Sequence, residues 1–207
     1  MRSEVIVLGH GGHFSSCMDV MSRIGYSLSL RGMPHVKHII PDTRILTEGD
    51  WDILVAQCNR FVLAIGQIHT PDDRISAIRE VTNRGGEFIS IASPTAYIAR
   101  TIELGKGAYI GHHAVINAWA AIGDYPILNT SCVIEHQAKV GNYCHISTGA
   151  VINGQASVGN RCFMGSNSVI LQQINICDDV LVGAGSVVIA DITEPGVYVG
   201  NPARKIR

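Results

Sequence analysis

The second half of the chain carries an apolar residue at every sixth position. The sixteen positions are Ile98, Leu104, Ile110, Ile116, Ile122, Leu128, Ile134, Val140, Ile146, Ile152, Val158, Met164, Ile170, Ile176, Val182 and Val188. Because only about half of the residues in an average protein are apolar, an unbroken series of this length is not chance. The pattern indicates an internal repeat of six residues.

A small residue stands two positions before most members of this series. The positions that follow this rule are Ala108, Ala114, Ala120, Cys132, Ala138, Cys144, Ala150, Ala156, Cys162, Ser168 and Ser186, whereas Ile102, Pro126, Ile174 and Val180 depart from it. Glycine often follows the series directly, at positions 105, 111, 123, 141, 159, 165 and 183. We expect these glycines to supply the backbone freedom that a corner between short strands requires.

The repeat predicts a triangular coil in which three hexads make one turn of 18 residues. Successive turns would stack about 4.8 Å apart, the spacing of neighbouring strands in a sheet. The large and the small residue of each hexad would share a narrow interior. Three cysteines of the small series, Cys132, Cys144 and Cys162, are then explained as small buried groups.

The first ninety residues predict alternating strands and helices. The expected strands are 4–8, 60–65 and 87–91, and the expected helices are 14–24 and 70–84. Thr70 is expected to cap the second helix, with Pro71 at its first position. Such an alternation is typical of a small parallel α/β sheet. We therefore expect an α/β domain over 1–92 and the repeat over 93–207, with Ser93-Pro94 between them.

Composition and charge exclude several classes of function. The 207 residues include 16 Lys+Arg and 17 Asp+Glu, a net charge of −1, which argues against nucleic-acid binding. Apolar stretches such as Arg60 to Ile65 are far shorter than a membrane span, and the start lacks the apolar region of a signal peptide. A cytoplasmic protein is expected. The six cysteines form no C-x-x-C pair, which predicts reduced thiols.

A glycine-rich turn follows the first expected strand. In Gly9-His10-Gly11-Gly12-His13-Phe14, backbone N–H groups and a helix N-terminus could meet a phosphate. The full dinucleotide fingerprint would need a glycine in place of Phe14. The alternative is that the turn only lets the strand and the helix pack closely, and the turn alone does not decide between the two.

The hexads resemble those of the hexapeptide-repeat acyltransferases. This resemblance implies a left-handed parallel β-helix, an exception to the right-handed crossover rule. It also implies a homotrimer, because the flat faces of such coils are commonly buried between subunits.

The whole chain is similar to one branch of that superfamily, the bacterial enzymes that acetylate nucleotide-linked amino sugars, together with the sialic-acid O-acetyltransferases. The similarity rests on G-x-G-G-H after the first strand, on Ala64-Ile65-Gly66, on S-P-T-A before the hexads, and on Ile134-Glu135-His136 with His145. It implies acetyl-CoA as the co-substrate, no metal, and a UDP-4-amino-4,6-dideoxy sugar as the usual acceptor.

Matching positions then suggest which residues hold the nucleotide sugar. They are Gly11, Gly12 and His13 in the first turn, and Gly66 and Gln67 in the second. Members of the branch usually carry an acidic pair at the end of the second strand, where it contacts the nucleoside. The segment Ser27 to Ile40 contains no acid, and Asp42 is the nearest substitute, so the identity of the nucleotide stays open.

Acyl transfer from a thioester needs a base for the attacking group and donors for the oxyanion. The resemblance implies His136 as the general base and Asn129 near the reaction centre. The repeat supports His136 independently, because its neighbours one coil away, Ala118 and Gly154, are small and leave room for a ligand. Glu135 would stack between Asn117 and Asn153, and it could replace the acid that usually follows the base.

The remaining implied residues would hold acetyl-CoA. The resemblance assigns His145 to the thioester region and the later coils to the slot for the coenzyme arm. The residues concerned are His145, Gly154, Ser166, Gly183, Ala184, Asn201 and Pro202. Asn201-Pro202 is at the same time a turn that ends the repeat.

The leading interpretation is an acetyl-CoA-dependent N-acetyltransferase of a nucleotide-linked amino sugar, serving bacterial surface glycan synthesis. O-acetylation of a sialic-acid-like sugar would use the same residues. A metal-dependent hydratase would need clustered histidine ligands with an H-x4-H pair, and the positions 112, 113, 136 and 145 contain none. A non-catalytic scaffold is the third class, since solenoids make good binding surfaces.

Overall fold

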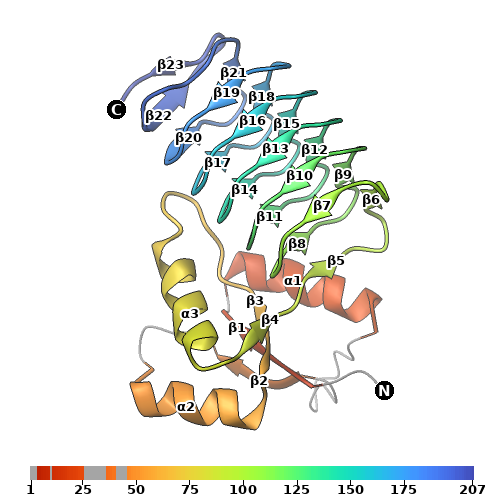
Figure 1. The fold of residues 1–207 in the computed structure, drawn as a ribbon, viewed down its shortest axis with the longest axis vertical. Coiled ribbons are helices and arrows are strands. Elements are labelled where there is room, and N and C mark those ends of the chain that lie inside the picture. Colours follow the sequence, from red (N-terminus) through yellow and green to blue (C-terminus); the bar gives the residue numbers. More distant parts are fainter. Residues whose placement is uncertain (1–3, 10, 26–35, 41–45) are drawn as a thin grey trace. The chain divides into compact units, whose positions relative to one another are not determined.

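The computed structural model describes residues 4–9, 11–25, 36–40 and 46–207 (Figure 1). The chain forms two compact units, Met1–Pro94 and Thr95–Arg207. The predicted fold class is confirmed: a small α/β unit is followed by a parallel β-helix. Among the described residues, no helix combines the length and the apolar character that crossing a bilayer requires.

The first unit is built on a four-stranded parallel sheet in the order β2-β1-β3-β4. Its strands are β1 (Val5–Leu8), β2 (Val36–Ile40), β3 (Arg60–Leu63) and β4 (Glu87–Phe88), and β5 (Ile91–Ala92) follows. Its helices are α1 (Gly12–Arg23), α2 (Glu48–Gln57) and α3 (Asp72–Asn83). Strand β1 is fully buried along its length, as the central strand of a covered parallel sheet should be.

Two features of the helices differ from the sequence analysis. Helix α2 was not predicted, although Thr47 and Asp50 form a complete capping box at its start. The expected cap at Thr70 is wrong: the N-cap of α3 is Pro71, without a side-chain cap bond, and the Pro71 carbonyl accepts from the N–H of Ile75. A proline at this position already has the φ angle that a helix start requires.

Gly9 brings the ends of β1 and β3 together. It has φ +120°, and a Cβ on it would lie 2.6 Å from the backbone carbonyl of Ala64. Only glycine combines this conformation with so close an approach. The turn after β1 and the turn after β3 therefore lie side by side.

The second unit is a β-helix with three faces, and each face is a parallel sheet along most of its length (Figure 1). Face 1 consists of β6 (Tyr97–Ile98), β9 (Val115–Ile116), β12 (Val133–Ile134), β15 (Val151–Ile152), β18 (Val169–Ile170) and β21 (Val187–Val188). Face 2 consists of β7 (Glu103–Leu104), β10 (Ala121–Ile122), β13 (Lys139–Val140), β16 (Ser157–Val158) and β19 (Asn175–Ile176). Face 3 consists of β8 (Tyr109–Ile110), β11 (Ile127–Leu128), β14 (His145–Ile146), β17 (Phe163–Met164), β20 (Val180–Val182), β22 (Gly196–Val199) and the antiparallel β23 (Arg204–Lys205).

The predicted register is confirmed. Paired strands are offset by 18 residues, as in Ile134 against Ile152, until the last coil, where Val182 pairs with Tyr198. From Ile110 to Val188, every sixth residue is at most 4% exposed. Leu104, in the first coil, is 39% exposed, because no earlier coil covers it.

The small positions of the hexads are interior, as expected. Cys132, Cys144 and Cys162 are completely buried, and all six cysteines are free thiols. Burial raises the pKa of Cys132 to about 12. The sulfur of Cys132 therefore acts as a small packing group in the neutral form.

The explanation of the corner glycines was wrong. From Leu104 to Val182, the left-handed backbone falls three residues after each inward position, mostly on residues other than glycine, for example Trp119 (φ 63°), Gln137 (φ 58°) and Gln155 (φ 62°). The glycines directly after the inward positions are needed for space. A Cβ on Gly141, for instance, would lie 2.7 Å from the backbone of Gly159 in the next coil.

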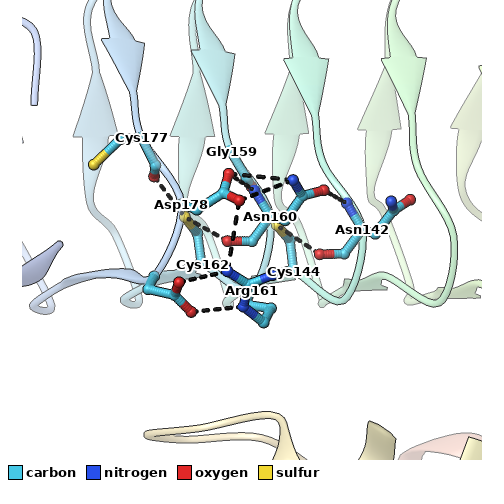
Figure 2. A network of polar contacts seen from close by, with 9 residues as sticks. Asn142, Cys144, Gly159, Asn160, Arg161, Cys162, Cys177 and Asp178 are labelled. Carbon is cyan, nitrogen blue, oxygen red and sulfur yellow. Dashed lines mark hydrogen bonds and ion pairs between the residues drawn. The ribbon is translucent and has the colours of Figure 1, made fainter. Parts of the chain in front are cut away.

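A ladder of amide and carboxylate side chains supports the corner between faces 2 and 3 (Figure 2). The Oδ1 of Asn160 accepts the backbone N–H of Asn142 at 2.9 Å, and the N–H of Asn160 donates to Asp178 at 2.8 Å. Arg161 pairs with Asp179, its Nε donating at 2.7 Å. The ladder satisfies corner N–H groups that the strands leave without partners.

Candidate active site

His136 lies at the corner between faces 1 and 2, two residues after the inward Ile134. Its exposed imidazole lies against Gly154, one coil further on. A Cβ on Gly154 would be 2.6 Å from both Cε1 and Nε2 of the ring. The missing side chain of Gly154 therefore provides the space in which the imidazole sits.

Glu135 holds the backbone of His136. Its Oε2 accepts from the Nδ2 of Asn117 at 2.9 Å and from the N–H of His136 at 3.3 Å. The expected stacking with Asn117 is present. Asn153 instead donates to the carbonyl of Ile170 at 2.9 Å. No bond joins this carboxylate to the imidazole among the described residues.

A pocket of about 360 Å³ extends from His136 along the next two coils. Polar residue types rich in amides, together with one glycine, line it: Glu135, His136, Asn153, Gly154, Gln155, Gln172 and Gln173. Gln173 donates to Gln155 at 2.9 Å, and Gln155 donates to Gln137 at 3.2 Å. This glutamine ladder fixes one wall of the pocket.

A second cluster lies on face 3 and at the corner between faces 3 and 1. The Nδ2 of Asn129 is 3.3 Å from the Nε2 of His145, which is 8% exposed and packs edge-on against Phe163. Further along this corner, the hydroxyl of Ser166 is 3.0 Å from that of Ser147.

The C-terminal residues continue the same corner. Ala184 stacks over Gly165, and the N–H of Gly200 donates to Ser186 at 3.0 Å, which ties the turn at Asn201-Pro202 to it. Gly183 and Ala184 thus lie in line with Ser166, one coil away.

The structure does not bring His136 and His145 together within one chain. The chain runs through faces 1, 2 and 3 in order, so the corner between faces 1 and 2 is opposite face 3. His136 stands at that corner and His145 on that face. The expected residues of the β-helix are therefore divided between two sides of the triangle.

A third group lies in the first unit. A Cβ on Gly66 would be 3.2 Å from the Cβ of His13, so the two turns meet as expected, and Gln67 beside them is buried. Among the described residues, added Cβ atoms on Gly11 and Gly12 would meet nothing within 4 Å. These two glycines leave open space at the start of α1. Asp42 lies outside the described residues.

Arg74 is a member of this group that the sequence analysis missed. It is 1% exposed, and its Nη1 donates to the carbonyl of Ile65 at 2.5 Å, in the second turn. Burial lowers its pKa to about 10. The signal was visible in the sequence, because Arg74 occupies the buried helical stripe of Ala77, Ile78 and Val81.

Comparisons with known proteins agree with this architecture. The family described as "hexapeptide repeat of succinyl-transferase" matches residues 155–190. No curated protein matches the sequence. Perosamine N-acetyltransferase from Caulobacter crescentus, a histidine-to-asparagine variant in complex with CoA and GDP-perosamine, is 25% identical with a TM-score of 0.85, covering 100% of this chain and 98% of that one.

The chain has the fold of this sugar acetyltransferase. The acetyltransferase domain of PglB from Neisseria gonorrhoeae, in complex with acetyl coenzyme A, shares the fold at 21% identity with a TM-score of 0.85 and covers 100% of both chains. WeeI from Acinetobacter baumannii shares it at 19% identity with a TM-score of 0.78, covering 99% of this chain and 100% of that one. The acetyltransferase fold thus includes both units of this chain.

The part of the chain that the structure describes holds no group of three or more His, Cys, Asp or Glu side chains placed to bind a metal ion.

Proposed function

We propose that this protein transfers the acetyl group of acetyl-CoA to the amine of a nucleotide-linked sugar. The observation that carries the proposal is the imidazole of His136, seated over Gly154 at the mouth of a polar pocket. The Caulobacter enzyme with the same fold was crystallised with CoA and GDP-perosamine, which supports these two substrates. The similarity to acetyltransferases also favours an enzyme over a scaffold.

In the proposed reaction, the sugar amine attacks the thioester carbonyl and His136 accepts a proton from the amine. The new C–N bond forms, the C–S bond breaks, and CoA leaves as a thiolate that takes the proton from the imidazole. Gly154 lies beside the imidazole, and a backbone N–H at this position would donate to the oxyanion. Glu135 acts as a positioning residue, because it bonds to the backbone of His136.

A second copy of the chain would complete the site. The outward positions of face 1 form an apolar strip of Tyr97, Val115, Val133, Val151, Val169 and Val187. The corresponding positions of face 2 are mostly polar, for example Glu103, Lys139 and Asn175. Burial of the strip against a neighbour would stabilise a homotrimer.

The strip lies between the corner of His136 and the corner of Asn129 and Ser166. A cyclic assembly that packs face 1 against a neighbour would set the His136 corner of one copy against the Asn129 and Ser166 corner of another. Asn129, His145, Ser166, Gly183, Ala184, Asn201 and Pro202 would then hold acetyl-CoA beside the His136 of the adjacent copy. The amides of the pocket suit the two amide groups of the coenzyme arm.

The first unit would bind the nucleotide. The open space at Gly11 and Gly12 allows a phosphate to approach the N–H groups at the start of α1, next to His13, Gly66 and Gln67. UDP is the nucleotide that the sequence resemblance favours, and GDP is the one bound by the Caulobacter enzyme. Both nucleotides belong in the test. We place the proposed reaction in the cytoplasm.

The test measures release of free CoA thiol with acetyl-CoA and either a UDP- or a GDP-linked 4-amino-4,6-dideoxy sugar. We expect His136→Asn to lower kcat by at least about 100-fold. His113→Asn is the matched control, because His113 is an exposed histidine outside the clusters described above. Full activity of His136→Asn would remove His136 as the base, and no transfer to any nucleotide-linked amine would refute the function.

A further inference from the structure

Trp119 is an exposed indole in a backbone conformation that bulky residues avoid. Its φ is 63° and its side chain is 67% exposed. The only other tryptophan, Trp51, is 4% exposed in the first unit. The left-handed conformation costs conformational free energy for an aromatic residue, so we look for a favourable contact of the side chain that offsets this cost.

The surroundings of Trp119 do not provide that gain within one chain. Its N–H donates to the Oγ1 of Thr101 at 3.2 Å, which fixes the backbone. Two tyrosines at another corner, Tyr125 and Tyr143, stack on each other with ring centroids 5.5 Å apart. The indole of Trp119 has no ring partner of this kind among the described residues.

Trp119 belongs to the same corner as His136, one coil closer to the N-terminus. Successive coils are about 4.8 Å apart, so the indole is within reach of any group that touches the imidazole. The residue directly beneath His136 is Ala118, whose methyl group leaves the space beside the indole open.

The two sides of His136 are therefore different in chemistry. On the C-terminal side the imidazole contacts Gly154, and the pocket is lined by Asn153, Gln155, Gln172 and Gln173. On the N-terminal side are the methyl group of Ala118 and the exposed indole of Trp119, while the amide of Asn117 is bonded to Glu135. The first side suits amide groups, and the second suits a flat ring with an apolar face.

We propose that the indole of Trp119 is the platform for the amine-bearing sugar ring of the substrate. The inference rests on the proposed function. The attacking amine must lie within hydrogen-bond reach of His136, so the ring that carries it must occupy the space within one coil of the imidazole. The nucleobase is separated from that ring by a diphosphate and cannot take the same place. The C–H face of the sugar packs on the indole and presents the amine to the base.

The test compares Trp119→Ala with Trp119→Phe, using the nucleotide-linked amino sugar on which the wild type is active. We expect Trp119→Ala to raise KM for the amino sugar about tenfold and to leave KM for acetyl-CoA within about twofold, while Trp119→Phe restores most of the loss. Tyr143→Ala is the matched control, because it removes an aromatic side chain from a left-handed position at the corner between faces 2 and 3.

Fluorescence gives a second readout that is independent of turnover. Trp119 is exposed and Trp51 is buried, so a change in emission that ligand causes in the wild type and that vanishes in Trp119→Phe reports Trp119. The nucleotide sugar should change the emission, whereas free UDP and free GDP should not.

Three results would overturn the platform. They are an unchanged KM for the amino sugar in Trp119→Ala, an equal response of the fluorescence to free nucleotide, and a loss of oligomeric state by light scattering in Trp119→Ala. The last would make Trp119 a subunit contact. Failure of the proposed function is a separate result, because it would show as absence of acetyl transfer in the wild type.

Discussion

Replacing Gly154 by alanine should impair catalysis while leaving the fold intact. The added Cβ would lie 2.6 Å from Cε1 and Nε2 of His136. Carbon atoms in contact prefer a separation of about 3.5 Å or more, so the imidazole must move by about 1 Å. The backbone of Gly154 lies outside the left-handed region, so alanine fits it without strain. A displacement of this size at a reacting group costs about 100-fold in rate.

Gly141→Ala is the informative comparison. There the added Cβ would lie 2.7 Å from the backbone C and O of Gly159, which cannot rotate away. We expect Gly141→Ala to lose about 1–3 kcal/mol of unfolding free energy and to keep its kcat when folded. Gly154→Ala should keep its unfolding free energy to within about 1 kcal/mol and lose kcat.

The assay pairs thermal unfolding, followed by circular dichroism, with steady-state kinetics of thiol release for the two variants. Steady-state kinetics at several pH values would show whether the remaining activity of Gly154→Ala still depends on one titrating group. Wild-type kcat in Gly154→Ala, or equal destabilisation of both variants, would refute the argument that Gly154 provides the seat of the imidazole.

Three further predictions test other parts of the structure. If the site is shared between copies, mixed trimers from equal amounts of His136→Asn and His145→Asn should regain about a quarter of wild-type activity, whereas no recovery would place the site within one chain. Asn160→Ala should lower the unfolding free energy by about 1–2 kcal/mol in denaturant titrations, since it strips the N–H of Asn142 of its acceptor, while Ser157→Ala should be neutral. Burial raises the pKa of the Cys132 thiol from its ordinary value of 9.0 to about 12, so its contribution to stability is present below pH 9 and is lost as the pH rises towards 12. Between pH 8.5 and 10.5, the melting temperature of Cys132→Ala should therefore fall less steeply with rising pH than that of the wild type. Identical slopes would contradict the buried neutral thiol.

The β-helix could be predicted closely because its sequence repeats with a fixed period of six residues. Each of the sixteen inward positions needs an apolar side chain, so each residue gives independent support for the same period. Ile134 or Val158 could therefore be assigned to the interior from the period alone. The corner glycines were misinterpreted because sequence shows which residue is small and not whether space or backbone angle requires it. Gly141 is small for space, while Gln137 takes the left-handed angle.

The first unit was harder because single elements carry less information. Helix α2 has only Trp51 and Leu54 as buried residues, too few for a clear periodicity, and only its capping box at Thr47 marked it. Arg74 fits the buried stripe of α3, but its bond to the carbonyl of Ile65 joins two segments that the helical pattern does not relate.

The separation of the two histidines could have been calculated from the sequence. Nine residues are half of an 18-residue coil, so His136 and His145 must project from opposite sides of the triangle. The resemblance named both residues but carried no information on which copy of the chain would supply each. Their roles stay predictions.

The coil also sets which changes of length the chain tolerates. Paired strands differ by 18 residues through most of the β-helix, so one extra coil inserted after Val158 would lengthen the solenoid and keep every later side chain on its own face. An insertion of six residues would preserve the hydrophobic interior just as well, yet it would rotate everything after it by a third of a turn, carrying Ser166 and Gly183 away from the corner they share with Asn129. The fold would thus tolerate insertions of any multiple of six residues, whereas activity would tolerate only multiples of eighteen.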